Sequence, residues 1–484
     1  MTSTTIPSAP RGGATARPAG GPTVLSNLAL ATLLLGAFLS IADFFIVNVA
    51  LTDIQARLHP STATLEMVIT GYGVPYALLL VAGGRLGDAL GRKRLFMAGM
   101  TAFTIASVAC GLAPTAGVLV ATRVVQGASA AMMVPQVLAS IQATTTGERR
   151  LRALGWFGAT AGLAAVVGQV VGGWLVSADL AGSGWRPIFL VNLPIGLLGL
   201  VLARRSVPDT RSDNPARHDW AGTALLGIAL LTLLVPLMEG RVLGWPAWTW
   251  VSLGVAPVAL VAFVVVERRL ERRGDVPLVP PSLVAVPSMA RGLLMVVPFF
   301  GGFGAFMFCY TVTAQVGLGL EAVETGLLIA PMAVTFLLAS LITPRLVARF
   351  DRGVMTFGAL LQVAGLAWTA SIISGQWPDV SLVSLAIAMC VAGLGQGLVA
   401  SPLFGVVLSH VPPASAGAGS GVLATTQQTA LALGVATLGN LFLGLAPNPR
   451  ADLGDAFATV LAIQLAVGVL VALLTRTLPR RSVN

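Results

Sequence analysis

The sequence is poor in charged residues and rich in apolar ones. Only 10% of its 484 residues are charged and 56% are hydrophobic, whereas a soluble globular chain carries about a quarter charged residues. Because a water-facing surface cannot be built from so few charges, the main body of the chain cannot be a soluble domain. Apolar runs of about twenty residues recur along the length, and each can cross a bilayer as a helix. The sequence therefore predicts an all-α integral membrane protein.

Cysteine and histidine are scarce, with three of each. Cys110, Cys309 and Cys390 each lie in an apolar run without pairing or metal-ligand spacing, so we assign them no chemistry. The histidines are expected in loops or at helix ends, far apart in sequence: His59, His218 and His410. An intramembrane enzyme would need a cluster of such groups, and a receptor would be favoured by a sizeable soluble domain. We therefore expect no enzymatic activity, no cofactor and no metal.

Lysine is almost absent, because all the 29 basic residues except Lys93 are arginine. These charges sit in short loops, which is typical of a membrane protein and argues against nucleic-acid binding. With a cytoplasmic N-terminus, the inner segments hold most of the arginines and the outer loops hold only four: Arg57, Arg186, Arg241 and Arg450. The asymmetry follows the positive-inside rule. It predicts a multi-pass protein of the plasma membrane with both termini in the cytoplasm, which requires an even number of spans.

The apolar runs predict fourteen transmembrane helices. Their approximate ranges are 26–50, 64–86, 95–113, 117–141, 152–177, 187–203, 220–239, 247–267, 291–316, 323–347, 354–374, 381–408, 416–446 and 455–476. Polar connections flank the seventh and eighth helices, which predicts two six-helix bundles with two extra helices between them. The expected domains are a disordered cytoplasmic tail at 1–25, an N-terminal bundle at 26–203, an insertion at 204–290, a C-terminal bundle at 291–476 and a cytoplasmic tail at 477–484.

The predicted loop between the second and third helices combines glycines with one acid and several bases. Its candidate gating residues are Gly84, Gly87, Asp88, Gly91 and Arg92. Glycines permit a tight turn, and Asp88 and Arg92 can form a pair that holds one conformation and breaks in another. A basic loop that only fixes the topology is the alternative from composition. The string is similar to the signature loop of the major facilitator superfamily: a glycine, a spaced Gly-Asp, then Gly-Arg-Lys.

Three further stretches resemble the fourteen-helix drug:proton antiporter branch of that superfamily. Residues 42–51, Ala-Asp-Phe-Phe-Ile-Val-Asn-Val-Ala-Leu, are similar to its Leu-Asp-x-Thr-x-Val-Asn-x-Ala-Leu-Pro, with Phe45 at the threonine and Thr52 at the proline. Residues 123–127 match Arg-x-x-Gln-Gly. Residues 168–173 resemble the antiporter element Gly-Pro-x-x-Gly-Gly, with Gln169 at the proline; its candidate residues here are Gly168, Gly172 and Gly173. The resemblance covers residues 26 to 476 and implies a proton-coupled exporter of drugs or antibiotics that works by alternating access.

Asp43 is the one acid clearly inside the apolar body of the predicted helices. A charge at mid-membrane costs roughly 2.5–3.5 kcal/mol on insertion scales, and such residues usually face a cavity and have a partner. Arg123 is the only base similarly deep, and both residues are expected roughly 9–11 Å below the outer helix ends at 1.5 Å per residue. We predict that Asp43 and Arg123 carry proton coupling. Binding of helix-end carbonyls is the alternative for Arg123.

The substrate-cavity candidates are aromatic and amide side chains: Phe44, Asn48, Gln126, Gln169, Phe303, Tyr310 and Gln427. Aromatic residues recur at helical spacing from Phe299 to Tyr310 and could form a wall for a lipophilic compound, although ordinary packing is the simpler interpretation. Intramembrane amides, with Asn192, Gln396 and Gln428 among them, could bind substrate or form interhelical hydrogen bonds.

The expected partners are a small molecule, protons and the lipid bilayer, with the protein acting as a monomer. One acid and few other fixed charges in the cavity would favour lipophilic and especially cationic substrates. A dedicated exporter or facilitator of a single metabolite is the alternative.

Overall fold

The computed structural model describes residues 25–210, 219–240, 243–275, 277–412 and 415–478. Within these ranges the secondary structure is entirely helical. The predicted tails at 1–25 and 477–484 lie almost wholly outside the described residues.

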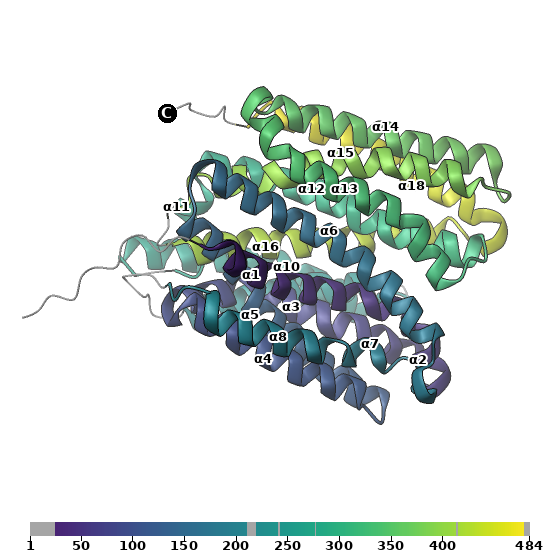
Figure 1. Ribbon diagram of the computed structural model, residues 1–484, viewed down its shortest axis with the longest axis horizontal. Coiled ribbons are helices and arrows are strands. Elements are labelled where there is room, and N and C mark those ends of the chain that lie inside the picture. The colour runs from purple at the N-terminus through teal and green to yellow at the C-terminus, as the bar shows by residue number, and fades with distance from the viewer. Residues whose placement is uncertain (1–24, 211–218, 241–242, 276, 413–414, 479–484) are drawn as a thin grey trace, which may run out of the picture.

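The N-terminal half is the set of helices from α1 to α8 (Figure 1). Its long helices are α1 (Asn27–Ile46), α3 (Thr62–Leu90), α4 (Arg92–Gly111), α5 (Ala116–Thr144), α6 (Gly147–Ser177) and α8 (Asn192–Ser206). Its short elements are η1 (Val47–Ala50), α2 (Leu51–Leu58), η2 (Leu180–Gly182) and α7 (Pro187–Leu190). Hydroxyl side chains begin several of these helices; Ser26, for example, accepts a 3.1 Å hydrogen bond from the Ala29 N–H and so satisfies one of the free amides of the first turn.

The insertion and the C-terminal half follow in the same way. The insertion comprises α9 (Trp220–Glu239), α10 (Ala247–Arg272) and the single turn α11 (Pro281–Val284). The C-terminal half comprises α12 (Pro287–Val312), the π-helical turn η3 (Thr313–Gly317), α13 (Ala322–Phe350), α14 (Gly353–Gln376), α15 (Leu382–Leu408), α16 (Ala416–Gly434), the π-helical turn η5 (Val435–Gly439), α17 (Asn440–Gly444) and α18 (Pro449–Thr475).

Thirteen helices in the described ranges are long and apolar enough to cross a membrane. The fourteenth predicted span corresponds to α16, η5 and α17, which follow one another without a break from 416 to 444. This run is rich in glycine, serine, threonine and glutamine, so its mean hydropathy is lower, and it packs between the two halves. The predicted fold class, two six-helix bundles with two extra helices between them, is confirmed.

Two helices join the halves. α6 packs on α1 within its own half and on α13 of the other, while α16 packs on α12 within its half and on α3 and α5 of the other. In the insertion, α9 and α10 pack on each other, and α9 also contacts α3 and α16. The largest buried hydrophobic cluster spans these seams, while two further clusters lie mainly within the C-terminal and the N-terminal half.

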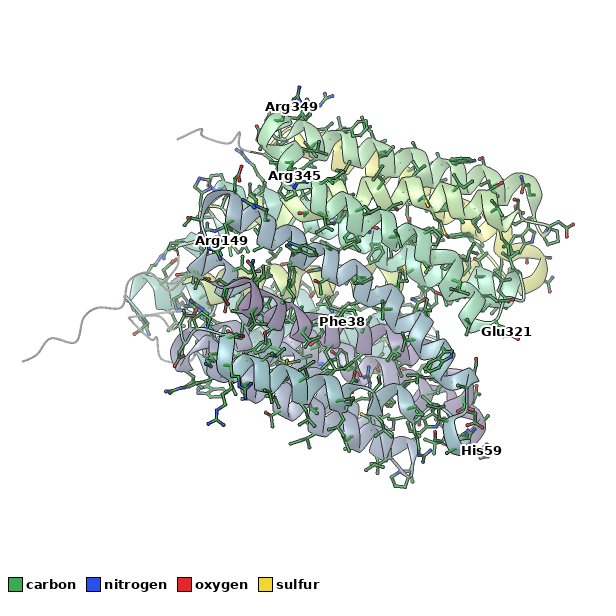
Figure 2. The ribbon with its side chains drawn as sticks, in the orientation of Figure 1. Phe38, His59, Arg149, Glu321, Arg345 and Arg349 are labelled. Carbon is green, nitrogen blue, oxygen red and sulfur yellow. The ribbon has the colours of Figure 1, made fainter. Side chains whose placement is uncertain are left out.

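The two ends of the molecule differ in charge. Figure 2 shows Arg149, Arg345 and Arg349 at the end where α6 begins and α13 ends, and His59 and Glu321 at the opposite end. We call these the arginine-rich end and the far end. The three labelled arginines were all predicted to lie inside, and they share one end of the molecule.

The predicted helix ends on both sides of the signature segment are wrong. The signature segment was expected to be a loop between helices ending near 86 and beginning near 95, but α3 runs to Leu90 and α4 starts at Arg92. Only Gly91 separates them, with a φ of +103°, a backbone conformation that favours glycine. The polar residues of the segment remain helical on both sides of Gly91. The turn is therefore a kink of one residue.

Candidate transport site

Asp43 and Arg123 form an ion pair inside the N-terminal half. Arg123 Nη1 donates to Asp43 Oδ2, and both side chains are 0% exposed. The other carboxylate oxygen, Oδ1, accepts hydrogen bonds of 2.9 Å from Gln126 Nε2 and 2.7 Å from Asn192 Nδ2. The acid from α1 is therefore held by side chains of α5 and α8. Charge-assisted hydrogen bonds of this kind make burial of a charge tolerable.

Arg123 has further partners that do not depend on Asp43. Its Nε donates to the Val68 carbonyl at 3.1 Å and its Nη1 to Gln126 Oε1 at 2.9 Å. The guanidinium carbon lies 4.3 Å from the ring centroid of Tyr72, a cation–π distance. Nη2 has no hydrogen-bond partner among the described residues. Arg123 can therefore remain buried and charged while its contact with the acid changes.

Asn192 belongs to this network, although the sequence left its role open. Besides its bond to Asp43, its Nδ2 donates at 2.8 Å to Ser107 Oγ of α4. Ser107 Oγ in turn donates to the Phe189 carbonyl at 2.9 Å. The role of this amide is interhelical hydrogen bonding, and its effect is to orient the carboxylate.

A cavity lies between the two halves, beside the ion pair. Its wall is built from α1, α3, α5 and α6 on one side and α12, α13, α15 and α16 on the other. It holds about 1080 Å³ of empty space, its open mouth included. None of the lining residues in the described part of the chain is charged.

The predicted cavity residues divide into two groups. Phe44, Phe303 and Gln427 line the cavity, as do Gln396 and Gln428. The remaining candidates are not part of its described wall: Asn48, Gln126, Gln169 and Tyr310.

Three of these four have identifiable surroundings. Gln126 binds the ion pair. The Tyr310 hydroxyl donates to the Thr325 carbonyl at 2.7 Å inside the C-terminal half. Gln169 is buried on α6, where it stands next to Gly168 at the contact with α1.

The acid lies behind the cavity wall and does not face the cavity. Ser40, Ile41 and Phe44 of α1 line the space, whereas Asp43 is not among the lining residues. The expectation that an acid stands in the substrate cavity is therefore wrong, because successive residues of a helix point in different directions. One helix nevertheless carries both features, so a shift of α1 at the ion pair also moves the cavity wall.

At the arginine-rich end, the signature segment contacts the other half. Arg92 Nη2 pairs with Asp88 Oδ1 at 2.7 Å, and both side chains are almost fully buried. Asp88 Oδ1 also accepts a 3.2 Å hydrogen bond from the Gly417 N–H in the first turn of α16, an end of a helix that favours negative charge. A Cβ on Gly84 would lie 2.2 Å from the Gly417 carbonyl oxygen. The halves therefore meet here backbone to backbone.

Other hydrogen bonds close the same end. Gln142 Nε2 of α5 donates to the carbonyls of Leu408 at 2.7 Å and Val411 at 3.1 Å. Ser420 Oγ of α16 donates to the Pro135 carbonyl at 3.1 Å. The two halves are thus joined at the arginine-rich end by several hydrogen bonds.

The signature segment is also tied to the insertion. Arg85 donates from Nε to the Leu278 carbonyl at 2.7 Å and from Nη2 to the Pro277 carbonyl. The next residue, Val279, donates its N–H to the buried Glu267 of α10 at 2.7 Å. This connection could not be predicted from the sequence, because its acceptors are backbone carbonyls of a distant segment.

The glycines of the predicted antiporter element lie at helix contacts of α6. A Cβ on Gly168 would lie 2.6 Å from the Ala42 carbonyl oxygen, and one on Gly172 would lie 2.6 Å from Ile46 Cγ1. A Cβ on Gly173 would lie 2.9 Å from Val323 Cγ2 of α13. The element therefore packs on the helix that carries Asp43 and on the opposite half.

Residues 33–229 and 220–435 match the family model of the Major Facilitator Superfamily. The chain belongs to the major facilitator superfamily. It is 37% identical to the "Probable actinorhodin transporter" of Streptomyces coelicolor, over 88% of this chain and 74% of that protein. It is 35% identical to the "Puromycin resistance protein pur8" of Streptomyces alboniger, over 93% and 90% of the two chains. The resemblance to the antibiotic or multidrug efflux type of the superfamily, expected from the sequence, is confirmed.

A solved structure of the superfamily has the same fold. The proton:xylose symporter XylE bound to 6-bromo-6-deoxy-D-glucose superposes with a TM-score of 0.65, covering 94% of this chain and 96% of that one. The two sequences are 15% identical, so the likeness concerns the fold alone.

Proposed function

We propose that this chain is a proton-coupled antiporter that exports lipophilic drugs or antibiotics by alternating access. The observation that carries the proposal is the buried Asp43–Arg123 pair, whose acid lies on α1, a helix that also forms part of the wall of a cavity between the halves. The names of its relatives, which refer to transport of and resistance to antibiotics, support export as the direction.

The closed arginine-rich end supports alternating access. We take this end to be cytoplasmic from the positive-inside rule, with the protein in the plasma membrane, both termini inside and a monomer as the working unit. The division at 26–203, 204–290 and 291–476 is part of the proposal. Substrate would enter after the contacts of Asp88, Gln142 and Ser420 with the other half break. It would leave in the state that has these contacts.

Asp43 is the proposed proton carrier. Protonation would remove its charge and weaken its bond to Arg123, which keeps the carbonyl of Val68, Gln126 and the ring of Tyr72 as partners. α1 would then be less firmly held to α5, and its cavity-lining residues would move with it. A proton entering down the membrane potential supplies roughly 2.3 kcal/mol per 100 mV, before any pH gradient is counted.

Proton release on substrate binding tests the proposal. The purified protein, in weakly buffered detergent solution with a pH-sensitive dye, is titrated with a compound that it binds. Antiport requires that substrate displace a proton, so the solution should acidify with a saturable dependence on substrate. Saturable binding without any acidification would contradict proton antiport and leave a facilitator.

A dedicated exporter of one metabolite is the second candidate. It is favoured by the relatives, whose names refer to single antibiotics, actinorhodin and puromycin. The range of compounds to which expression confers resistance in a pump-deficient host distinguishes the two. Resistance to a single compound across a broad panel would favour the dedicated exporter.

A further inference from the structure

The cavity wall combines aromatic rings with a small set of polar side chains. Phenylalanines come from both halves: Phe44, Phe45, Phe157, Phe299, Phe300, Phe303 and Phe336. The polar side chains of interest are Tyr76 of α3, Gln396 of α15, and Gln427 and Gln428 of α16. Aromatic faces favour flat ring systems as ligands. The aromatic rings therefore determine the shape of the cavity wall. The four polar side chains determine which ligands it selects.

These four polar groups have no hydrogen-bond partner in the described part of the chain. Tyr76 and Gln396 are each 4% exposed, so they are almost fully withdrawn from bulk water. Buried polar groups are nearly always hydrogen-bonded. A site whose polar groups lack hydrogen-bond partners therefore discriminates strongly in favour of a ligand that forms hydrogen bonds with them. The Tyr76 hydroxyl and the Gln396 amide are thus available to form hydrogen bonds with a bound molecule.

The charge of the wall limits what that molecule can be. Its described residues include no acid and no base. The nearest buried charges identified on α1 and α5, those of Asp43 and Arg123, neutralise each other behind the wall. A cation in this space would lose its water without gaining a counter-charge, which is costly. The aromatic faces of the wall offer a cation part of what it loses in water but no counter-charge, so the cavity favours an uncharged compound.

We propose that the transported compounds are uncharged, flat ring systems that carry carbonyl or hydroxyl groups at their edges. Carboxamides and a phenol both donate and accept hydrogen bonds, so either kind of oxygen can be bound. Tyr76 lies in one half and the three glutamines in the other, so one ligand with oxygens at opposite edges bridges the halves. This inference rests on the proposed function and replaces its expected preference for cations.

Three probes with one skeleton test the inference. Acridone is neutral and has a carbonyl and an N–H, anthracene has the same three rings without polar groups, and 10-methylacridinium is a permanent cation of similar size. Binding to the full-length protein in lipid nanodiscs is measured by probe fluorescence. Acridone should bind about tenfold or more tightly than anthracene, the scale of one or two buried hydrogen bonds. 10-Methylacridinium should bind weakest.

Substitutions assign the discrimination to named residues. Gln396→Leu and Tyr76→Phe should each weaken acridone binding about tenfold and leave anthracene binding unchanged. Gln427→Glu places a carboxylate in the wall and should reverse the preference, so that 10-methylacridinium binds better than acridone. Gln464→Leu is the matched control, because Gln464 is a buried amide of α18 outside the cavity. Size-exclusion profiles confirm that each variant is folded.

The outcomes separate this inference from the proposed function. Equal binding of acridone and 10-methylacridinium to the wild-type protein would overturn the inference whatever the proton assay shows, and so would the absence of binding by all three probes. Preferential binding of acridone without acidification of the solution would support the inference and contradict proton antiport.

Discussion

Asp88, near the end of α3, accepts a hydrogen bond from the backbone N–H of Gly417 at the start of α16. The ion pair with Arg92, across the kink at Gly91, orients this carboxylate. This side chain thus links the two halves at the arginine-rich end, together with Gln142 and Ser420. The strength of this Asp88 hydrogen bond should affect how often the arginine-rich end opens. It should not affect which compounds the cavity binds.

The first prediction follows from this contact. Asp88→Asn removes the negative charge that pairs with Arg92 and that is stabilised by the first turn of α16. The contact between the halves at the closed end is therefore weakened. Efflux in proteoliposomes should slow several-fold while the substrate Kd in detergent changes less than twofold, because the cavity is untouched. Asp209→Asn is the control, since among the described residues the one ion pair of that acid is exposed, at 3.9 Å from Arg94, and such a pair contributes little. Wild-type efflux by Asp88→Asn would leave the segment with a topological role alone.

The second prediction concerns the contact of α6 with α1. Gly168→Ala places a methyl group 2.6 Å from the Ala42 carbonyl oxygen, so the helices must separate next to Asp43. Overpacking of this kind costs about 1–3 kcal/mol, and the midpoint of thermal unfolding in detergent should fall. Gly254→Ala in α10 is the control, because nothing lies within 4 Å of the added Cβ. An unchanged midpoint for Gly168→Ala would show that the contact is looser than described.

The third prediction concerns orientation. Single cysteines are introduced at His59, Glu321 or Arg349 after Cys110, Cys309 and Cys390 are replaced. An impermeant thiol reagent added to intact cells should label the first two, which lie at the far end, and should not label position 349 at the arginine-rich end. Labelling at 349 from outside would reverse the topology, and with it the assignment of the closed end to the cytoplasm.

The ion pair could be predicted from the sequence because charge is rare inside apolar helices. Asp43 and Arg123 stood out by type and depth, and the structure pairs them. Their polar neighbours could not be assigned in the same way. Whether Gln126 or Asn192 faces a cavity or another helix depends on the rotation of α5 and α8, which the mixed polarity of those helices does not fix.

The extent of the cavity along α12 could not be predicted from the sequence either. The aromatic spacing on α12 correctly predicted a helix, and Phe299 and Phe303 line the space. Phe306 and Tyr310 continue the pattern, yet they pack among buried residues of the C-terminal half. Helical periodicity indicates a common face but does not show how far along that face the cavity extends. That extent is determined by the packing of the opposite half.

Asp43 is proposed to carry the coupling proton. The direct measurement is accumulation of substrate by proteoliposomes under an imposed pH gradient, with wild-type protein, Asp43→Asn and Asp43→Glu reconstituted in equal amounts. Substrate exchange at equal pH on both sides serves as the control for a folded, mobile transporter. Asp43→Asn should retain exchange but lose accumulation against a gradient, and Asp43→Glu should keep part of it. Full accumulation by Asp43→Asn would contradict the account and leave Asp43 with a structural role.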